Sequence, residues 1–497
     1  MLLNQVRQTN KAIATSVPAP VGGWNTRDAL DAMDAKDAVL LDNWFPTTGN
    51  CQLRDGYAEH STGMGSGDVE TLFEYHSGST RKLIACANSN IYDASSSTAS
   101  SLGSGYTNNQ WDIVNFNGNA HLVNGADNPV AYDGSSLSNP SWTGTGLTIS
   151  NLVGVNVFKN RLFFWENNSQ DFWYASINAE SGTLTKFPLS RVSQFGGKLL
   201  TMETWTLDSG EGADDYAVFI MSSGDVIVYQ GTDPGDSAAW ALVGRYHIGE
   251  PINSRCAAKM GGDLLIGTVD DYVSLTTVLR TGQVGQSSKI SGAVLDASSN
   301  SSLFGWQFIL DNSSNRFVSN VPKTDGTYDQ HVLNTVTGAW TRFVDIPSVT
   351  WSTYNKDLYF GSTNGKVYKM TGNTDDGSAI NADGRQAWNS FNTPQTKRLA
   401  AIRPIISSNF RIEYEIGVGF DFKDALAPSP TSTSSSNSLW DVALWDVALW
   451  DGDEIVDVQW RVRGGVGQNL SPRLRVSGEQ AVKWLRTDYR MEAGVYL

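Results

Sequence analysis

The chain has 497 residues, of which 40% are hydrophobic, so it can bury a large core and form two or three domains. Its 36 Lys and Arg against 51 Asp and Glu give a formal charge of −15, which disfavours a sequence-independent grip on nucleic-acid phosphates. The same charge suits either a conduit whose acidic wall repels a passing duplex or the simple maintenance of solubility.

The cysteine content and the hydropathy pattern exclude several classes of protein. Cys51, Cys86 and Cys256 are widely spaced and odd in number, which argues against a disulfide scaffold or a zinc cluster and predicts ordinary core thiols. No apolar run reaches the length of a membrane span, and residues 1–7 lack the apolar core of a signal peptide. We therefore expect no membrane insertion and folding in a cytoplasm.

Residues 23–57 contain the most distinctive order of motifs in the chain. Gly23-Trp24 enters a turn, Asn25 or Thr26 can cap a helix, and a short helix is expected from its apolar face. That face consists of Ala29, Leu30, Met33, Ala38, Leu40 and Leu41. An exit turn is expected from residues 43–46, Asn-Trp-Phe-Pro, together with Gly49-Asn50, followed by a short strand over residues 53–57, Leu-Arg-Asp-Gly-Tyr.

This order of glycine-x-asparagine, acidic helix, asparagine-aromatic-phenylalanine-proline and arginine-x-glycine-tyrosine resembles the amino-terminal region of tail proteins from short-tailed bacteriophages, the podoviruses. In that family the chain builds the tail nozzle, also called tail tubular protein B or packaged-DNA stabilisation protein. The resemblance covers residues 23–57 of this chain.

From residue 68 to residue 371 one pattern recurs: an apolar strand, a turn of Gly, Asn or Asp, and a second strand that ends in an aromatic residue. Copies of the pattern span 82–93, 119–134, 155–175, 216–229, 264–275, 316–334 and 357–370. Together with 11% aromatic residues and 48 glycines, the pattern predicts an all-β chain with a β-propeller of about six or seven irregular blades. A stacked array of β-sandwiches is the alternative.

The predicted domain order has four parts. Residues 1–67 form an N-terminal arm that contains residues 23–57, which we name the signature segment, and residues 68–371 form the propeller. Residues 372–438 contain a polar loop, strands and a Ser, Thr and Pro linker, and residues 439–497 contain a tryptophan repeat and an additional C-terminal β domain.

The tryptophan repeat is an almost perfect five-residue repeat, Leu-Trp-Asp-Val-Ala, which places Trp440, Trp445 and Trp450 within residues 439–451. A period of five matches neither a strand nor a helix, so the three indoles cannot share one flat face of either element. They must be buried against this chain or against a partner. The predicted assembly contacts are Trp24, Trp44, Phe45, Trp440, Trp445 and Trp450.

No catalytic, metal-binding or cofactor-binding constellation is visible in the sequence, so we expect that the protein is not an enzyme. The histidines, His60, His76, His121, His247 and His331, are scattered and are expected in turns or strands. Acidic residues near predicted strands could serve a propeller glycoside hydrolase, but such residues are common at blade turns, and the sialidase Asp-box pattern does not occur. These residues are Asp112, Asp225, Asp263 and Asp357.

The resemblance implies a structural subunit of the phage tail, made in the cytoplasm of the host bacterium and located in the virion tail. Six copies would form a ring below the adaptor of the portal complex, retain the packaged genome and conduct double-stranded DNA during ejection without specific binding. Tail needle, fibre or plug proteins would be further partners, and no cofactor is implied. The alternatives are a receptor-binding tail protein whose exposed tryptophans stack on glycans and, behind it, a propeller glycoside hydrolase.

Overall fold

The computed structural model describes residues 13–208, 213–281, 288–409, 412–424, 427–428, 430 and 455–493. Strands dominate these residues, and the two α-helices among them are short, α1 (Leu275–Thr281) and α2 (Ser291–Ser298). Neither helix in this part of the chain is long and apolar enough to cross a membrane. The chain divides into unit 1 (residues 1–58, 331–344 and 371–497) and unit 2 (residues 59–330 and 345–370).

Unit 2 is built from small antiparallel sheets whose strands follow one another in the chain. The first two sheets are β7 (Val69–Ser77), β8 (Thr80–Ala87), β9 (Asn90–Asp93) and β10 (Ser100–Ser104), then β11 (Asp112–Phe116), β12 (Asn119–Val123), β13 (Val130–Tyr132) and β14 (Leu137–Ser138). The third sheet is β16 (Leu152–Phe158), β17 (Arg161–Glu166), β18 (Phe172–Tyr174) and β20 (Thr185–Phe187), beside the small parallel pair β15 (Trp142–Thr143) and β19 (Gly182–Thr183). The fourth is β21 (Leu199–Asp208), β22 (Ala213–Met221), β23 (Asp225–Gly231) and β24 (Trp240–His247).

Three further sheets complete the series. The fifth sheet is β25 (Ala257–Met260), β26 (Asp263–Gly267) and β27 (Tyr272–Ser274). The sixth begins with β28 (Gln307–Asp311), β29 (Arg316–Pro322) and β30 (Tyr328–Asn334), and β30 continues into unit 1. The seventh is β32 (Ser348–Tyr354), β33 (Asp357–Ser362) and β34 (Val367–Met370).

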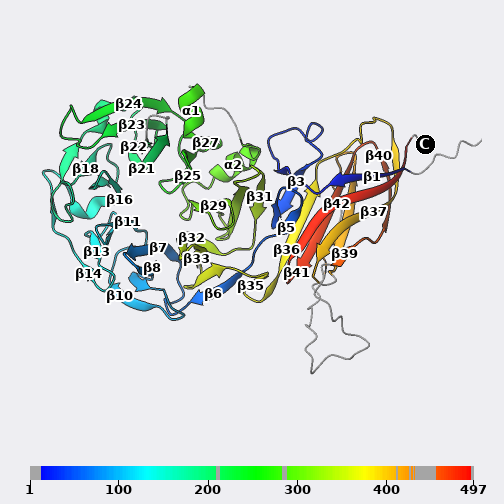
Figure 1. The fold of residues 1–497 in the computed structure, drawn as a ribbon, viewed down its shortest axis with the longest axis horizontal. Helices are drawn as coiled ribbons and strands as arrows, with labels where there is room; N and C mark the ends of the chain where they lie inside the picture. The colour runs from blue at the N-terminus through cyan, green and yellow to red at the C-terminus, as the bar shows by residue number, and fades with distance from the viewer. Residues whose placement is uncertain are drawn as a thin grey trace, which may run out of the picture. The chain divides into compact units, whose positions relative to one another are not determined.

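The first strand of each sheet contacts the neighbouring sheet, and β32 of the seventh sheet contacts β7 of the first, so the sheets close into a ring (Figure 1). The outer strand of the seventh sheet is β6 (Tyr57–Ser61), which pairs with β34 although the two are far apart in the chain. Lys366 binds Glu59 across this joint at 2.6 Å. Unit 2 is therefore a seven-bladed β-propeller closed by a strand from the N-terminal side, and the propeller prediction is confirmed.

The hairpins of the propeller follow from local turn chemistry and alternating apolar residues. At the turn between β11 and β12, Asn117 and Gly118 have φ of 50° and 87°, as a two-residue hairpin turn of type I′ requires. Apolar rings then pack between neighbouring sheets: the Phe172 and Phe219 rings stack at 4.6 Å and 10°. Phe172 is fully buried, so such pairs fix how adjacent blades face each other.

Four inner strands carry an irregularity at the same place. The register shifts near the start of β7, β16, β21 and β32, so that one residue of the inner strand has no partner opposite it. Such a bulge increases the local right-handed twist of the strand. The blades thus repeat one another in backbone geometry as well as in strand order.

Unit 1 is a two-sheet β-sandwich and is the additional β domain expected toward the C-terminus. One sheet contains β1 (Ile13–Pro18), β4 (Trp44–Pro46), β5 (Cys51–Leu53), β37 (Lys397–Ser408), β39 (Ile455–Asp457), β40 (Arg461–Gly467) and β42 (Val482–Ala493). The other contains β2 (Gly23–Trp24), β3 (Asp37–Asp42), β31 (Trp340–Phe343), β35 (Thr374–Asp375), β36 (Ser378–Gln386), β38 (Tyr414–Phe420) and β41 (Leu470–Gly478). N-terminal strands are thus integral to both sheets.

The two sheets of unit 1 pack through tryptophan side chains at a glycine. The rings of Trp44 and Trp484 lie 5.7 Å apart, and neither side chain is exposed. A Cβ atom on Gly384 of β36 would lie 2.9 Å from Trp484 and 3.1 Å from Trp44. Gly384 therefore lets the two indoles lie directly against the facing strand.

The helix expected within the signature segment is wrong. Residues 25–36 form turns, and Asp37–Asp42 form the strand β3. The buried Asn25 side chain accepts bonds from the N–H groups of Arg27 and Asp28 and donates to Asp28 and Asp37 at 2.8 Å. These bonds tie the two ends of the loop together and compete with helix formation.

The exit turn expected after that helix is confirmed in part. Trp44–Pro46 form the strand β4, whereas Gly49 and Asn50 lie in a turn that the Thr47 N–H closes by donating to the Asn50 carbonyl at 2.8 Å. The stretch 53–57 is not a single strand, because β5 ends at Leu53 and β6 begins at Tyr57.

Candidate functional site

The signature arginine lies at the centre of a buried polar network in unit 1. The Arg54 side chain is fully buried and forms a two-point ion pair with Asp375 at 2.8 and 2.7 Å. It also donates to the Asn43 side chain at 2.8 Å and to the carbonyls of Asp55 and Val344 at 3.0 and 3.2 Å. These contacts use all five N–H groups of the guanidinium, so its burial is fully compensated.

Neighbouring signature residues make this network possible. Asn43 adopts φ of 59°, a left-handed conformation that asparagine tolerates, and its carboxamide receives the Arg54 and Val344 donors. A Cβ atom on Gly56 would lie 2.0 Å from the Thr374 carbonyl oxygen. The arginine-x-glycine spacing therefore reflects one buried ion pair and one close approach of two backbones.

The predicted assembly contacts within the signature segment are buried inside unit 1. Trp24 is 5% exposed and lies edge-on to His331 at 5.5 Å, Trp44 is fully buried against Trp484, and Phe45 is 8% exposed. Trp440, Trp445 and Trp450 lie outside the described residues. The assignment of these six residues to assembly contacts stays a prediction.

The inner strands of the propeller bring a second set of polar side chains together, which we name the axial cluster. Its members lie on or next to the first strand of a blade: Glu70, Asp112, Glu203, Arg255, Lys259, Gln307 and Thr350. Sequence reasoning singled out only Asp112, as an ordinary turn acid. The others come from five blades, with Arg255 and Lys259 both at β25, and each looks like an isolated polar residue in the sequence.

Arg255, next to β25 of the fifth blade, binds residues of three other blades within the axial cluster. One amino group donates to the Gln307 side chain at 2.5 Å and to the Thr350 hydroxyl at 2.6 Å, and the other donates to the Glu70 carbonyl at 3.4 Å. Its guanidinium also lies 5.1 Å from the centre of the Phe304 ring. Burial lowers the pKa of Arg255 to about 10, and the nearby Asp112 and Glu70 carboxylates oppose that shift.

Two carboxyl groups of the axial cluster have raised pKa values. Burial raises the pKa of Asp112 to about 6, against the effect of the Val155 N–H, which donates to it at 2.8 Å, and of Arg255. Burial raises the pKa of Glu203 to about 7, opposed by Lys259 and reinforced by Asp112. Both pKa values therefore lie close to neutral pH because of burial.

Other inner-strand side chains fasten one blade to the next by binding its main chain. Asn115 donates to the Glu74 carbonyl at 2.9 Å, Asn156 donates to the Met202 carbonyl at 2.7 Å, and Trp205 donates to the Gly262 carbonyl at 3.0 Å. Gln307 both donates to and accepts from the main chain of Trp351, at 2.9 and 2.8 Å. The polar interior of the propeller therefore connects blades, which is a structural use of its hydrogen-bonding groups.

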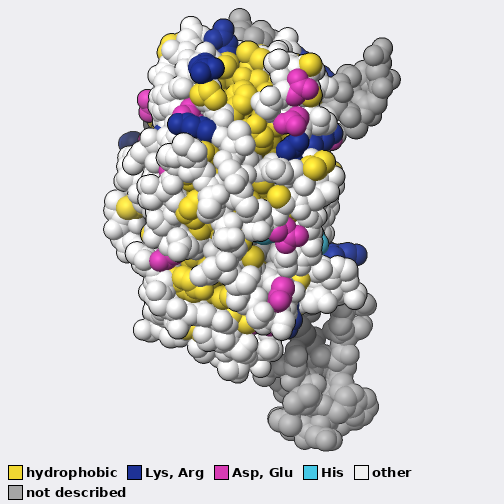
Figure 2. All heavy atoms as spheres, turned by 90° about the vertical axis from the view of Figure 1, so that its left-hand side faces the viewer, with side chains coloured by type: hydrophobic (Ala, Val, Ile, Leu, Met, Phe, Trp, Pro, Cys, Tyr) yellow, Lys and Arg dark blue, Asp and Glu magenta, His cyan; other side chains and the backbone are white. Residues whose placement is uncertain are grey.

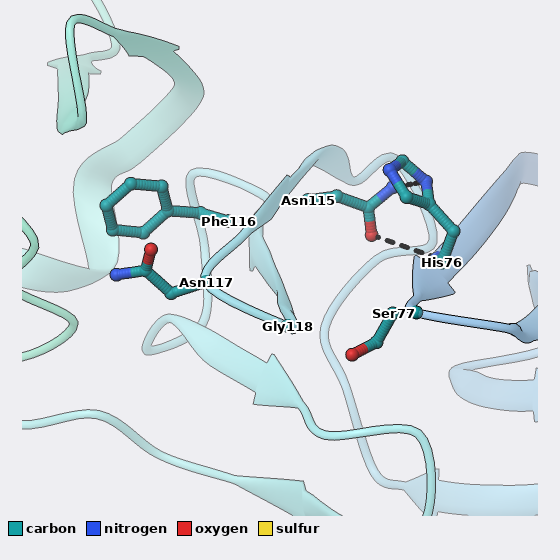
Figure 3. Close-up of a pocket in the computed structure, with 7 residues that line it drawn as sticks. His76, Ser77, Asn115, Phe116, Asn117 and Gly118 are labelled. Carbon is teal, nitrogen blue, oxygen red and sulfur yellow. Dashed lines mark hydrogen bonds between the residues drawn. The ribbon is translucent and has the colours of Figure 1, made fainter.

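A shallow surface pocket of about 250 Å³ lies where the β7–β8 turn meets the β11–β12 turn (Figure 3). It is lined by His76, Ser77, Gly78, Asn115, Phe116, Asn117 and Gly118. The Asn115 amide lies 2.9 Å from Nδ1 of the His76 ring, and the two side chains lie together at one end of the pocket. Among the described residues, no group of three or more His, Cys, Asp and Glu side chains is placed to hold a metal ion.

The propeller also exposes an apolar area, seen near the top of the face in Figure 2. Exposed large apolar residues of the third and fourth blades include Phe195, Leu242 and Val243. The open edge strand β24 carries a bulge opposite Val228 and Tyr229. A bulge twists an edge strand and so opposes its pairing with another chain.

The predicted roles of the cysteines and histidines are confirmed. All three thiols are buried, and burial raises the pKa of each. All five histidines lie in strands: β6, β7, β12, β24 and β30. Burial and Arg342 lower the pKa of His331 to about 3, so this ring is neutral at physiological pH.

No protein-family model and no curated protein matches the chain. Its fold is similar, at low sequence identity, to solved structures. BBS1N in complex with ARL6DN has a TM-score of 0.42 and 8% identity, over 65% of this chain and 99% of that one. PorZ of Porphyromonas gingivalis has a TM-score of 0.40 and 10% identity, over 83% of this chain and 59% of that one. YCF48 bound to D1 peptide has a TM-score of 0.39 and 11% identity, over 70% and 99%.

Proposed function

We propose that this protein is a structural subunit of a bacteriophage tail nozzle, present as a ring below the head-to-tail adaptor. In this role it retains the packaged genome and conducts double-stranded DNA during ejection. The ring contains six copies, contacts the adaptor and portal complex, and receives tail needle, fibre or plug proteins. The protein acts in the virion tail and makes or breaks no covalent bond.

The observation that carries this proposal is the way the signature segment folds. Arg54 binds both Asn43 and Asp375 in one buried network, and Gly56 lies against the main chain of Thr374, next to Asp375. Their spacing is therefore required by a particular architecture of unit 1. A resemblance in residues that an architecture requires supports a common architecture more strongly than a resemblance in solvated residues does.

The interior of the propeller supports a structural role as well. Its inner polar side chains bind the main chain of the next blade, and Arg255 joins its own blade to three others. A body held together in this way resists deformation, as a subunit of a pressurised tail must. The net charge of −15 also suits a conduit through which DNA slides without adhering.

Imaging of the purified protein by cryo-electron microscopy, with and without phage heads that carry the adaptor, tests the proposal directly. We expect six-fold rings with an axial opening near the width of a DNA duplex, alone or on the adaptor. Mass photometry of the same sample gives the copy number. A protein that stays monomeric and never occupies the tail axis would overturn the proposal.

A second candidate, a propeller glycoside hydrolase, is favoured by one observation, the raised pKa of both Asp112 and Glu203. Against it, the Asp112 carboxylate receives the Val155 N–H at 2.8 Å and so takes part in joining two blades. An assay on host surface polysaccharides distinguishes the candidates. Cleavage that disappears in both Asp112→Asn and Glu203→Gln, with the fold intact, would replace the nozzle proposal by the hydrolase.

A further inference from the structure

Strands β39 and β40 of unit 1 turn their apolar side chains toward solvent. Over residues 456–466 the apolar residues occupy alternate positions, and we name their outward surface the valine face. It consists of Val456, Val458, Trp460, Val462 and Val466, which are 45%, 52%, 39%, 79% and 39% exposed. A strand at the edge of a sandwich normally turns such residues inward, so this surface has the properties of a contact site.

The intervening polar residues hold the strand in this orientation. Arg461 lies over the Tyr414 ring at 5.1 Å, and Arg463 donates to the Ile416 carbonyl at 2.9 Å. In β40, Val462 pairs with Ala401 of β37. A slip of one residue would bury the valines but would break these contacts, so the outward valine face belongs to the fold itself.

The valine face lies in a basic environment. Strands β37, β39 and β40 carry five basic residues and one acidic residue, Asp457, although the whole chain has a charge of −15. Arg398 pairs in register with Val466, and its side chain is 64% exposed and lies 4.0 Å from the Glu492 carboxylate of β42. Arg403 lies over the Trp460 ring at 4.5 Å, and Arg490 of the adjacent β42 is exposed. A partner of this face needs an apolar residue flanked by carboxylates.

The loop between β2 and β3 has that chemistry. We name residues 28–34, Asp-Ala-Leu-Asp-Ala-Met-Asp, the acidic loop. Leu30 is 42% exposed, and Asp31 and Asp34 beside it are exposed as well. The bonds of Asn25 to Asp28 and Asp37 fix both ends of the loop, so the loop loses little conformational entropy when it binds.

The valine face and the acidic loop belong to opposite edges of the sandwich. In the second sheet of unit 1 the order is β31, β3, β36, β41 and β38, so β3 lies near one edge and β38 at the other. The acidic loop leads into β3, whereas β40 contacts β38. Two different patches at opposite edges of one subunit suit a head-to-tail contact between copies, and such contacts generate rings.

We propose that the valine face of one copy binds the acidic loop of a second copy. Leu30 of the second copy packs among the exposed valines around Val462, and its Asp31 and Asp34 pair with Arg398 and Arg490. This inference rests on the proposed ring function and assigns the contact between neighbouring copies. It uses no residue of the axial cluster.

Charge reversal on the two surfaces, separately and together, tests the pairing. The variants are Asp31→Arg with Asp34→Arg, Arg398→Glu with Arg490→Glu, the combination of all four, and Val462→Asp. Ile177→Asp is the matched control, because Ile177 is 58% exposed but lies in unit 2. Circular dichroism and thermal unfolding confirm that each variant is folded, and mass photometry over a dilution series measures ring dissociation.

We expect each double reversal and Val462→Asp to raise the concentration needed for rings by about tenfold or more. The four-residue combination should recover most of that loss, and Ile177→Asp should behave like the wild type. Rings that persist unchanged in Val462→Asp and both reversals would overturn this contact and leave the nozzle proposal standing. Loss of rings without recovery in the combination would overturn the acidic loop as the partner. A wild type that forms no ring, alone or on the adaptor, would overturn both proposals.

Discussion

The propeller and the sandwich are both made of antiparallel strands, but they differ in how far along the chain their strands find partners. Most propeller hairpins join strands a few residues apart, such as β11 and β12. The sandwich pairs β1 with β42 and β3 with β36, which brings the two ends of the chain together. We therefore expect the sandwich to depend on a few buried contacts between distant segments, and the propeller to spread its stability over many local ones.

Arg54→Ala is expected to show the largest difference in stability between the sandwich and the propeller. It removes the guanidinium that pairs with the buried Asp375 carboxylate, so unit 1 should lose about 3–5 kcal/mol of unfolding free energy. Denaturant unfolding measures the loss. The control is Arg81→Ala, which removes a propeller ion pair with Glu74 whose arginine side chain is 47% exposed. It should cost no more than about 1 kcal/mol. Equal losses in the two variants would contradict the contrast.

Removing one large buried ring from each unit tests how far a local loss of packing spreads through that unit. Trp44→Ala and Trp173→Ala should each cost about 3–5 kcal/mol, since both indoles are almost fully buried. Hydrogen exchange should rise across β5, β36 and β42 in Trp44→Ala but mainly in the second and third blades in Trp173→Ala, because Trp173 packs between those two blades. Faster exchange throughout both units in Trp173→Ala would show that the blades do not open independently of the rest of the protein.

The stability of the propeller should depend on pH through two buried carboxyl groups. The folded-state pKa values of Asp112 and Glu203 are raised to about 6 and about 7, so the folded propeller binds more protons than the unfolded chain above pH ~4. Protonation spares the folded state the cost of burying two charges, so this contribution to stability is complete below pH ~4 and is lost as pH rises to about 7, on the order of 3 kcal/mol per group. Unfolding measured from pH 4 to 8 should show this decline. Asp112→Asn with Glu203→Gln should flatten it, and an unchanged slope would contradict the assignment.

The smallest expected effect concerns the contact between the first and second blades. Asn115→Ala removes the bond to the Glu74 carbonyl and should cost about 1 kcal/mol. His76→Ala removes an exposed ring beside the same asparagine and should cost less than about 0.5 kcal/mol. Parallel thermal unfolding of both variants checks the order. A larger loss for His76→Ala would show that the ring, and not the amide, joins the blades.

The difference between local strand pairing in the propeller and distant strand pairing in the sandwich also explains which features could be predicted from the sequence. Turns such as Asn117-Gly118 and alternating apolar residues encode each hairpin locally, so the propeller was predictable. The pairing of β6 with β34 and the buried Arg54–Asp375 pair depend on contacts between distant segments, which no local pattern contains. The expected helix after Asn25 failed for a more local reason, because the Asn25 bond to Asp37, 12 residues away, outweighs helix preference within the loop. The axial cluster was missed likewise, since its members meet only when the ring closes.

The strand that seals the propeller also sets an order of events on the ribosome. β6 ends at Ser61 and its partner β34 begins at Val367, so about 300 residues must be synthesised between them. At roughly 5–20 residues per second this takes on the order of 15–60 s, during which blades can form one after another but the ring stays open. The nascent chain therefore carries an unpaired β6 edge through most of its translation. Chaperone binding or a translational pause in that interval would act on the yield of closed propellers without changing the stability of the finished protein.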